Sequence, residues 1–466
     1  MKYSKVNNDD IVFFENILGE NNIISKQGLD KFSCDHTEDL NYLPEVVLFP
    51  TNTNQVSKIV KYCNVKIIPI TPSAALTGLS GGALPLYGGV SMSFKKMNKI
   101  LDVNPRSFQA IVEPGLINEE FQNEISKYGL FYPPDPASKG SCTLGGNISL
   151  NAGGPRAVKY GVTSNFVLNL EVVLPDGQII WTGANTLKNS TGYNITQLMV
   201  GSEGTLGIVT KAVLKLLSLP KKNILMLVPF SKIEEACKVV SQIFFNGIFP
   251  SCIEFMEKSS IELVKRYNLC EIPFCIKHDA YLLIELDGNN LDVLFKNAEN
   301  LNTIFCKYDC GEVLFAESEF EKNKLWSVRR NIAIAVKSFS TYKEEDTVVP
   351  RDKLPELIRG VKAIGKKYNF KSVCYGHAGD GNLHVNILKD NLSNYEWNTI
   401  IKKGIREIFK LCVSLGGTIS GEHGIGLVQK DYIDIPFSKE SMSLQKRIKK
   451  LLDPNNIMNP GKIFPD

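Results

Sequence analysis

Three glycine-rich segments in the first half of the chain restrict its fold more than any other feature. They are residues 71–89 (TPSAALTGLSGGALPLYGG), residues 131–161 (FYPPDPASKGSCTLGGNISLNAGGPRAVKYG) and residues 201–208 (GSEGTLGI). Glycines let a backbone reverse and bring several N–H groups toward one point, which is how protein loops hold a pyrophosphate. The second segment adds small hydroxyl and amide side chains that leave space for a flat ligand. We therefore expect a ligand site here, rather than an irregular β domain with glycine corners alone.

The pattern of predicted secondary structure changes near residue 219. Before it, short apolar runs bounded by Gly, Pro and Asn predict one helix at 54–63 and strands at 45–49, 66–70, 89–94, 99–103, 168–174, 178–181 and 209–217. After it, strands are expected at 224–229, 280–286, 312–316, 371–375 and 383–388. Between them lie amphipathic helices, two of which begin at capping boxes, Ser231–Glu234 and Ser393–Glu396. We expect an α+β protein whose second half packs helices on one face of a mostly antiparallel sheet.

Size and composition are those of a globular protein with two or three domains. The chain has 466 residues, of which 43% are hydrophobic and 22% charged, and this excludes a fibrous or largely disordered protein. A net charge of +4, with no clustered basic stripe, argues against nucleic acid as a partner. The eleven cysteines form no C-x-x-C pair, which favours reduced thiols in a cytoplasmic protein. Without a secretory signal or a run of about 18 apolar residues, we expect a soluble chain with no transmembrane segment, cytoplasmic or peripheral at a membrane.

Histidine is scarce, and its distribution is uneven. Of five histidines, His377 and His384 share the motif YGHAGDGNLHVN, and His423 follows Glu422 in ISGEHGIG. Imidazole together with carboxylate suits Zn²⁺, Mn²⁺ or Fe²⁺, and three protein ligands leave positions open for a substrate. The two motifs therefore predict a catalytic metal site.

The order of the glycine motifs carries a family resemblance. GLSGGALPL, then PPDPAS and TLGGNISLNAGG with VKYG, then GSEGTLGIVT, resembles the flavin-binding domain of the vanillyl-alcohol oxidase and p-cresol methylhydroxylase (PCMH) family. The histidine motifs are similar to those of the branch with glycolate oxidase flavoprotein subunits, D-lactate dehydrogenases and D-2-hydroxyglutarate dehydrogenases. The resemblance implies a two-part FAD-binding domain of PCMH type over 1–218, a cap (substrate) domain with an antiparallel sheet covered by helices over 219–420, and a C-terminal segment, 421–466, that returns to the FAD domain.

The resemblance also implies which residues contact FAD. They are Pro72, Ser73, Thr77, Gly78, Ser80, Gly81, Gly82, Pro134, Asp135, Ser138, Thr143, Gly145, Gly146, Asn147, Asn151, Gly153, Gly154, Tyr160, Gly161, Glu203, Gly204, Ile208 and Asn459. The first loop holds no histidine or cysteine for a covalent link, so we expect non-covalent FAD. That loop reads SAALTGL over 73–79 where relatives read Arg-Gly-x-Gly-Thr-Gly-Leu. Losing a guanidinium and two glycines predicts weaker FAD binding or altered contacts.

For the reacting site, the resemblance implies His377, His384 and Glu422 as ligands of a Zn, Mn or Fe ion and His423 as the catalytic base. It implies that Arg329, on an expected helix, binds the substrate carboxylate. Asn386 lies on the same strand face as His384, and Lys343 is a weaker candidate because the alignment slips by one residue there. Ala333 stands where the 2-hydroxyglutarate enzymes carry a hydroxyl residue, which argues against a dicarboxylate substrate.

The leading hypothesis is an FAD- and metal-dependent dehydrogenase that oxidises a D-2-hydroxy acid, such as D-lactate or glycolate, to the 2-oxo acid. Because no cysteine-rich extension is present, electrons are expected to pass to an external acceptor: an electron-transfer flavoprotein, a quinone or an iron–sulfur subunit. The resemblance allows a homodimer. One alternative is a non-catalytic paralogous subunit with impaired FAD binding. Another is a metal-dependent hydrolase built on the histidines, which leaves the glycine segments unexplained.

Overall fold

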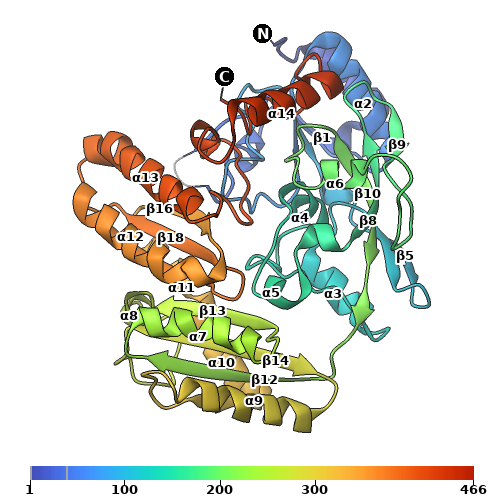
Figure 1. Ribbon diagram of the computed structural model, residues 1–466. Helices are drawn as coiled ribbons and strands as arrows, with labels where there is room; N and C mark the ends of the chain where they lie inside the picture. The colour runs from blue at the N-terminus through green and yellow to red at the C-terminus, as the bar shows by residue number, and fades with distance from the viewer. Residues whose placement is uncertain (1–2, 38–39, 466) are drawn as a thin grey trace. The chain divides into compact units, whose positions relative to one another are not determined.

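The computed structural model describes residues 3–37 and 40–465 and divides into two units (Figure 1). The first unit consists of Met1–Gly153, Val162–Leu219 and Glu422–Asp466. The second consists of Gly154–Gly161 and Pro220–Gly421. Each unit therefore combines stretches that are distant in sequence.

Two larger sheets and a short strand pair form the framework of the first unit. In the four-stranded sheet, ordered β1-β2-β4-β3, strand β4 runs parallel to β2 and β3. Its strands are β1 Ile23–Ile24, β2 Val46–Leu48, β3 Ile70–Ser73 and β4 Val90–Ser93. The five-stranded sheet is antiparallel in the order β5-β6-β10-β8-β9. Its strands are β5 Ile100–Asn104, β6 Gln109–Val112, β8 Val167–Val173, β9 Ile179–Trp181 and β10 Ile208–Lys215, and the separate pair is β7 Leu130–Phe131 with β11 Leu217–Ser218.

The helices of the first unit are α1 Asn8–Leu18, α2 Thr53–Lys66, α3 Asn118–Ser126, α4 Leu144–Leu150, α6 Ile195–Met199 and α14 Lys439–Leu452. Helix α2 buries one face in the core of this unit, through Val56, Ile59, Val60 and Cys63. The strand expected at 66–70 is wrong at its start. The helix continues to Lys66, Ile67 turns the chain with a φ of 56°, and the strand begins only at Ile70.

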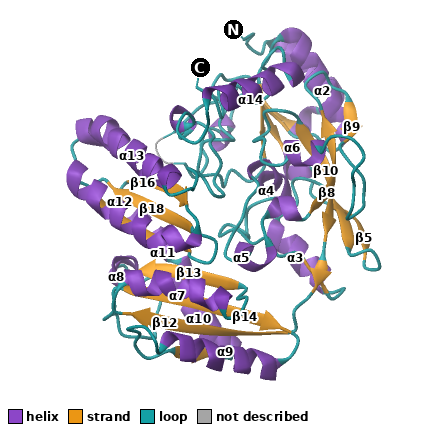
Figure 2. Ribbon diagram, viewed as in Figure 1, coloured by secondary structure: helices purple, strands orange, loops and turns teal. Residues whose placement is uncertain are grey.

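A seven-stranded antiparallel sheet organises the second unit (Figure 2). Its order is β15-β12-β14-β13-β17-β18-β16. The strands are β12 Lys222–Phe230, β13 Cys252–Glu257, β14 Ala280–Gly288, β15 Leu314–Ala316, β16 Tyr342–Val348, β17 Lys371–His377 and β18 Asn382–Leu388. Sequence patterns predicted five of these strands and missed β13 and β16. Both missed strands carry acidic residues, which are depleted in strands and hide the apolar alternation.

Helices lie on both faces of this sheet, so the expectation of one covered face is wrong. They are α5 Ala157–Tyr160, α7 Ile233–Phe245, α8 Lys258–Arg266, α9 Leu291–Phe305, α10 Glu319–Arg330, α11 Ile332–Phe339, α12 Leu354–Tyr368 and α13 Ile401–Ser414. Helices α8, α10 and α11 pack into a buried cluster with Val373 and Tyr375 of β17. Lys362 of α12 instead binds the side chains of Glu257 and Ser372, which project to the opposite face.

The two expected capping boxes have different outcomes. The Ser393 hydroxyl accepts from the Glu396 N–H at 3.2 Å, and the Glu396 carboxylate accepts from the Ser393 N–H at 2.8 Å, which confirms the second box. The first box is wrong, because α7 begins at Ile233 with no side-chain cap. Among the described residues, no helix is both long and apolar enough to cross a membrane.

Candidate active site

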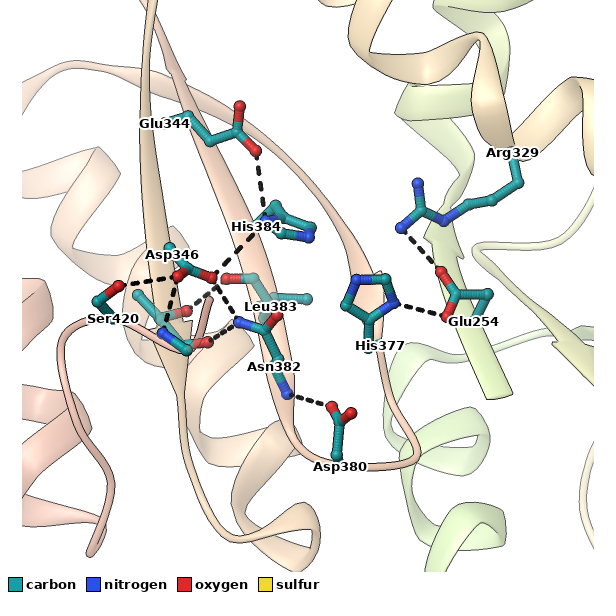
Figure 3. Close-up of polar contacts among 12 residues, drawn as sticks. Glu254, Arg329, Glu344, Asp346, His377, Asp380, Asn382, Leu383, His384 and Ser420 are labelled. Atoms are coloured by element: carbon teal, nitrogen blue, oxygen red, sulfur yellow. Dashed lines mark hydrogen bonds and ion pairs between the residues drawn. The ribbon is translucent and has the colours of Figure 1, made fainter. Parts of the chain in front are cut away.

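One face of the second unit's sheet collects two of the predicted histidines, His377 and His384, together with carboxylates that the sequence analysis did not predict (Figure 3). His377 of β17 lies opposite Glu254 of β13, and His384 of β18 lies opposite Asp346 of β16. Side chains opposite one another on neighbouring strands project to the same face. Because β17 also pairs with β18, strand register gathers these four side chains from three separated stretches of sequence.

A fully buried carboxylate, Glu254, joins two of the predicted site residues. Its Oε1 lies 2.7 Å from Nδ1 of His377, and its Oε2 lies 2.8 Å from Nη2 of Arg329. Burial acts to raise the pKa of Glu254, but the charges of His377 and Arg329 outweigh it and hold the pKa below its ordinary value. The Arg329 guanidinium also lies 4.8 Å from the ring centre of Tyr375, on the same face.

His384 has a similar acidic environment. Its Nδ1 lies 3.3 Å from Oε1 of Glu344 and 3.9 Å from Oδ1 of Asp346. Asp346 is fixed in turn, because it accepts hydrogen bonds from the Asn382 amide at 2.7 Å and from the Gly421 N–H at 2.7 Å. In both histidines, therefore, Nδ1 faces a carboxylate. A proton on Nδ1 leaves the lone pair of the imidazole on Nε2, the arrangement found around metal-bound histidines.

Two buried polar side chains near this face contain atoms with no hydrogen-bond partner among the described residues. Nε of Arg329, a residue that is 9% exposed, has no hydrogen-bond partner. The Asn386 side chain is fully buried beside the Tyr375 phenol, and neither its amide nitrogen nor its oxygen makes a hydrogen bond of standard geometry. Buried polar groups are normally paired, so these atoms indicate a place for a polar ligand.

Strand alternation separates Lys343 from the other candidates. Its neighbour Glu344 lies opposite Asn386 on the histidine face, so Lys343 projects to the other face, where its ammonium lies 4.8 Å from the ring centre of Trp397. The structure thus does not bring Lys343 together with Arg329 and Asn386. Ala333 is exposed on α11. The sequence analysis missed Glu254 and Glu344, because they lie on the two strands that it did not predict, β13 and β16.

The first and third glycine segments meet in the first unit. A Cβ on Gly204 would lie 2.5 Å from Cγ of Pro72, which shows how closely the proline ring packs on this glycine. The Asn459 amide donates to the carbonyl oxygens of Gly82 and Glu203, at 2.8 Å each. The tail residue Asn459 therefore ties the two glycine segments together.

Hydrogen bonds fasten the segment around His423 to these loops within the first unit. The Ser80 hydroxyl donates to the carbonyl oxygen of His423 at 2.9 Å. The Glu203 carboxylate accepts from the N–H groups of Ile425 and Gly426, at 2.8 Å each. Burial raises the pKa of the Glu203 carboxyl, and the two N–H donors oppose the rise. Glu422 and His423 follow Gly421 directly in the chain.

The second glycine segment surrounds α4. Thr143 caps this helix by accepting from the Gly146 N–H at 3.3 Å, and Gly145 packs so closely on Pro114 that a Cβ would lie 2.6 Å away. The remaining candidates of the first unit lie on β3 and its loop (Ser73, Thr77, Gly78, Gly81), before α4 (Pro134, Asp135, Ser138), around α4 (Asn147, Asn151, Gly153) and at the start of β10 (Ile208).

These residues fit FAD. A Cβ added at Gly82 would meet nothing closer than 3.8 Å, and one added at Gly146 nothing closer than 3.4 Å, so space remains beside both glycines. Oδ1 of Asn459 is buried with no hydrogen-bond partner among the described residues. Space beside glycines together with an unsatisfied buried acceptor suits a flat cofactor that carries hydroxyl groups.

Three of the expected FAD residues, Gly154, Tyr160 and Gly161, belong to the second unit. The Tyr160 hydroxyl donates to Asp287 at 2.6 Å, and burial and this carboxylate raise the pKa of Tyr160. Within the second unit, Tyr160 is thus held by Asp287.

The altered first loop contains a strained residue. Leu76, at a position where relatives carry glycine, has a φ of 59°. An L-residue with a side chain is disfavoured in this left-handed region by roughly 1–2 kcal/mol. The departure from the family sequence thus has a conformational cost at this residue.

Comparison with known proteins gives the same family for both halves of the chain. Residues 44–183 match the model of an FAD binding domain, and residues 219–463 match that of FAD linked oxidases, C-terminal domain. The chain is 38% identical over 441 residues to glycolate oxidase subunit GlcD of Bacillus subtilis (strain 168), covering 94% of this chain and 93% of that protein. It is 36% identical over 470 residues to a D-lactate dehydrogenase of Anaerostipes hadrus, covering 99% and 98%.

The fold is that of the PCMH-type flavoproteins. A crystal structure of p-cresol methylhydroxylase with substrate bound matches with a TM-score of 0.81 at 18% identity, covering 100% of this chain and 98% of the other. The α+β fold class is confirmed. The chain belongs to the FAD-linked oxidase family and is an FAD-linked oxidoreductase of the glycolate oxidase and D-lactate dehydrogenase type.

Proposed function

We propose that the protein oxidises a D-2-hydroxy monocarboxylic acid, such as D-lactate or glycolate, to the 2-oxo acid. The observation that carries the proposal is a set of buried polar atoms without a standard hydrogen bond, Nε of Arg329 and the carboxamide of Asn386, beside the histidines whose Nδ1 atoms face carboxylates. The Nε edge of a guanidinium pairs with a carboxylate, and a carboxamide bonds to a hydroxyl or carbonyl oxygen. A 2-hydroxy acid supplies both groups.

The charge of this face favours one carboxylate in the substrate over two. Among its described residues, Arg329 supplies positive charge, whereas Glu344 and Asp346 supply negative charge beside His384. A second carboxylate would meet these acids rather than a cation. We therefore propose that a dicarboxylate is a poorer substrate than D-lactate or glycolate.

We further propose that His377, His384 and Glu422 hold a divalent Zn, Mn or Fe ion. One support is the carboxylate that lies at Nδ1 of each of His377 and His384. The other is that Gly421, whose N–H donates a hydrogen bond to Asp346, directly precedes Glu422 in the chain. Such an ion, when bound, lowers the pKa of a substrate hydroxyl. His423, as a neutral imidazole, accepts the hydroxyl proton while Arg329 holds the carboxylate in place.

FAD, held without a covalent bond, supplies the hydride acceptor when bound. We expect the glycine-segment residues of the first unit to bind and orient it. Reduced flavin then needs an external electron acceptor, either an electron-transfer flavoprotein, a quinone or an iron–sulfur subunit.

The test is anaerobic reduction of flavin-loaded, metal-loaded protein by D-lactate, glycolate, D-2-hydroxyglutarate and longer D-hydroxy acids. We expect D-lactate or glycolate to bleach the visible flavin bands most rapidly. His423→Ala is expected to retain FAD and lose the bleaching. If no hydroxy acid bleaches the loaded protein, the proposal is wrong.

A second candidate, a non-catalytic subunit that has lost FAD, is favoured by the strained Leu76 in the first loop. It predicts protein that stays colourless after incubation with FAD. Turnover of an ester or amide without flavin would instead support a metal-dependent hydrolase.

A further inference from the structure

Glu254 connects a proposed metal ligand to the proposed substrate-binding arginine through one carboxylate group. Oε1 is 2.7 Å from His377 Nδ1, and Oε2 is 2.8 Å from Arg329 Nη2. The three residues come from β13, β17 and α10 (Figure 3). We propose that Glu254 is a positioning residue that aligns His377 and Arg329 together, so that metal binding and carboxylate binding are coupled through it. This inference rests on the proposed function.

The contact with His377 determines which ring nitrogen carries the proton. A carboxylate accepts and does not donate, so Nδ1 of His377 must hold its proton toward Glu254. The lone pair then lies on Nε2, and the ring cannot rotate without breaking a buried hydrogen bond. Losing such a partner of a metal-bound histidine typically weakens metal binding 10- to 100-fold.

The contact with Arg329 determines the orientation of the guanidinium plane. Glu254 binds one terminal nitrogen, and the ring of Tyr375 lies 4.8 Å from the guanidinium carbon. With these two contacts in place, the unpartnered Nε remains for a ligand. Because Arg329 is buried, removing its carboxylate partner would leave its charge uncompensated and free the plane to rotate.

Together, the two contacts of Glu254 couple metal binding at His377 to carboxylate binding at Arg329. Glu254 is fully buried, so solvent does not replace either contact when the other moves. A metal that fixes His377 also restrains Glu254, and Glu254 restrains Arg329. By reciprocity, a carboxylate ligand on Arg329 must then tighten metal binding by the same factor by which the metal tightens carboxylate binding.

The test compares the FAD-loaded wild type with Glu254→Gln, which preserves shape but removes the negative charge that pairs with Arg329 and leaves one carboxamide oxygen to accept from His377. Mn²⁺ affinity is measured by equilibrium dialysis with and without pyruvate, a 2-oxo acid that does not reduce flavin. For Glu254→Gln we expect Mn²⁺ binding about 10- to 100-fold weaker and a pyruvate effect close to one. At saturating Mn²⁺, KM for D-lactate should rise by more than kcat falls.

The matched control is Glu285→Gln, in the same sheet. Glu285 is also buried, but it accepts from the Ser251 hydroxyl at 2.8 Å and contacts neither His377 nor Arg329. It should bind Mn²⁺ as the wild type does. Wild-type Mn²⁺ affinity and pyruvate coupling in folded Glu254→Gln would overturn this inference alone. A wild type that binds no divalent metal would overturn the proposed function and this inference with it.

A measurement on the unaltered protein covers the case in which Glu254→Gln does not fold. With only five histidines, ¹⁵N-labelling of histidine allows their tautomers to be assigned by NMR. Metal-free protein is expected to carry the His377 proton on Nδ1. A proton on Nε2 alone would overturn the inference without any variant.

Discussion

At the scale of single residues, the loop after β3 contains a conformation that its side chain disfavours. Leu76 has a φ of 59°, and glycine adopts this region without penalty. We expect Leu76→Gly to raise the free energy of unfolding of the FAD-loaded protein by about 1 kcal/mol, because strain relief exceeds the added chain entropy. Its FAD dissociation constant should fall. Urea unfolding and fluorescence titration with FAD measure the two quantities.

The neighbouring Ala75→Gly is the control for that prediction. Ala75 is not among the residues with positive φ, so its replacement adds chain entropy and relieves no strain. We expect a loss of about 0.5–1 kcal/mol. Equal losses in both variants would contradict the assignment of strain to Leu76.

A second residue, Lys462, predicts a pH dependence. It is buried, and its ammonium donates to the carbonyl of Leu84 at 2.7 Å. Burial lowers its pKa to about 7, although Glu203 and Asp35 act in the opposite direction. In an unfolded chain the pKa is about 10.4. Between these values the unfolded chain binds a proton at this lysine that the folded chain does not, so the contribution of Lys462 to stability rises with pH from about 7 to about 10.4.

FAD-free protein is the sample for this test, so that a bound cofactor does not contribute to the stability profile. The contribution from Lys462 approaches about 1.36 kcal/mol per pH unit within the window. Lys462→Met should remove that contribution from the stability profile measured by urea unfolding. An unchanged slope in the variant would show that Lys462 is charged in the folded protein.

At the scale of elements, two similar sequence signals offer a matched pair of substitutions. Ser393 forms a reciprocal capping box with Glu396, whereas Ser231 caps nothing on α7. Ser393→Ala is expected to cost about 1 kcal/mol of stability, and Ser231→Ala to change it by less than about 0.5 kcal/mol. Chemical unfolding of both variants measures the difference. A similar cost in both would mean that the helix starts differ from those described.

The composition of each strand explains whether the sequence predicted it. Strands such as β12 and β14 are long apolar runs, and their burial in the sheet follows from hydrophobicity. Strands β13 and β16 carry carboxylates whose burial is compensated by partners on other strands and helices. Those partners are distant in sequence, so no local pattern indicates that Glu254 or Asp346 is buried.

At the scale of the whole molecule, the residues proposed to bind FAD differ from those proposed to bind the metal. Removing the metal should therefore not remove FAD. We expect dialysis against a chelator to abolish flavin bleaching by D-lactate while the protein keeps FAD, because the proposed metal ligands are not among the proposed FAD residues. Adding back Zn²⁺, Mn²⁺ or Fe²⁺ should restore bleaching and identify the metal. Absorbance spectra before and after dialysis measure both losses. Full activity after verified metal removal would contradict the proposed metal site.

The sequence by itself determined the fold family, the FAD cofactor and the group of candidate residues. Glycine spacing and short histidine motifs are local in sequence, and they reflect backbone and ligand chemistry that few other residues satisfy. Only the tertiary structure decided that Glu254 joins His377 to Arg329, that Glu344 rather than Lys343 lies on the histidine face, and that Tyr160 binds Asp287. The physical reason is strand register: a shift of one residue moves a side chain to the opposite face of a sheet, and long-range pairing, not local sequence, sets that register.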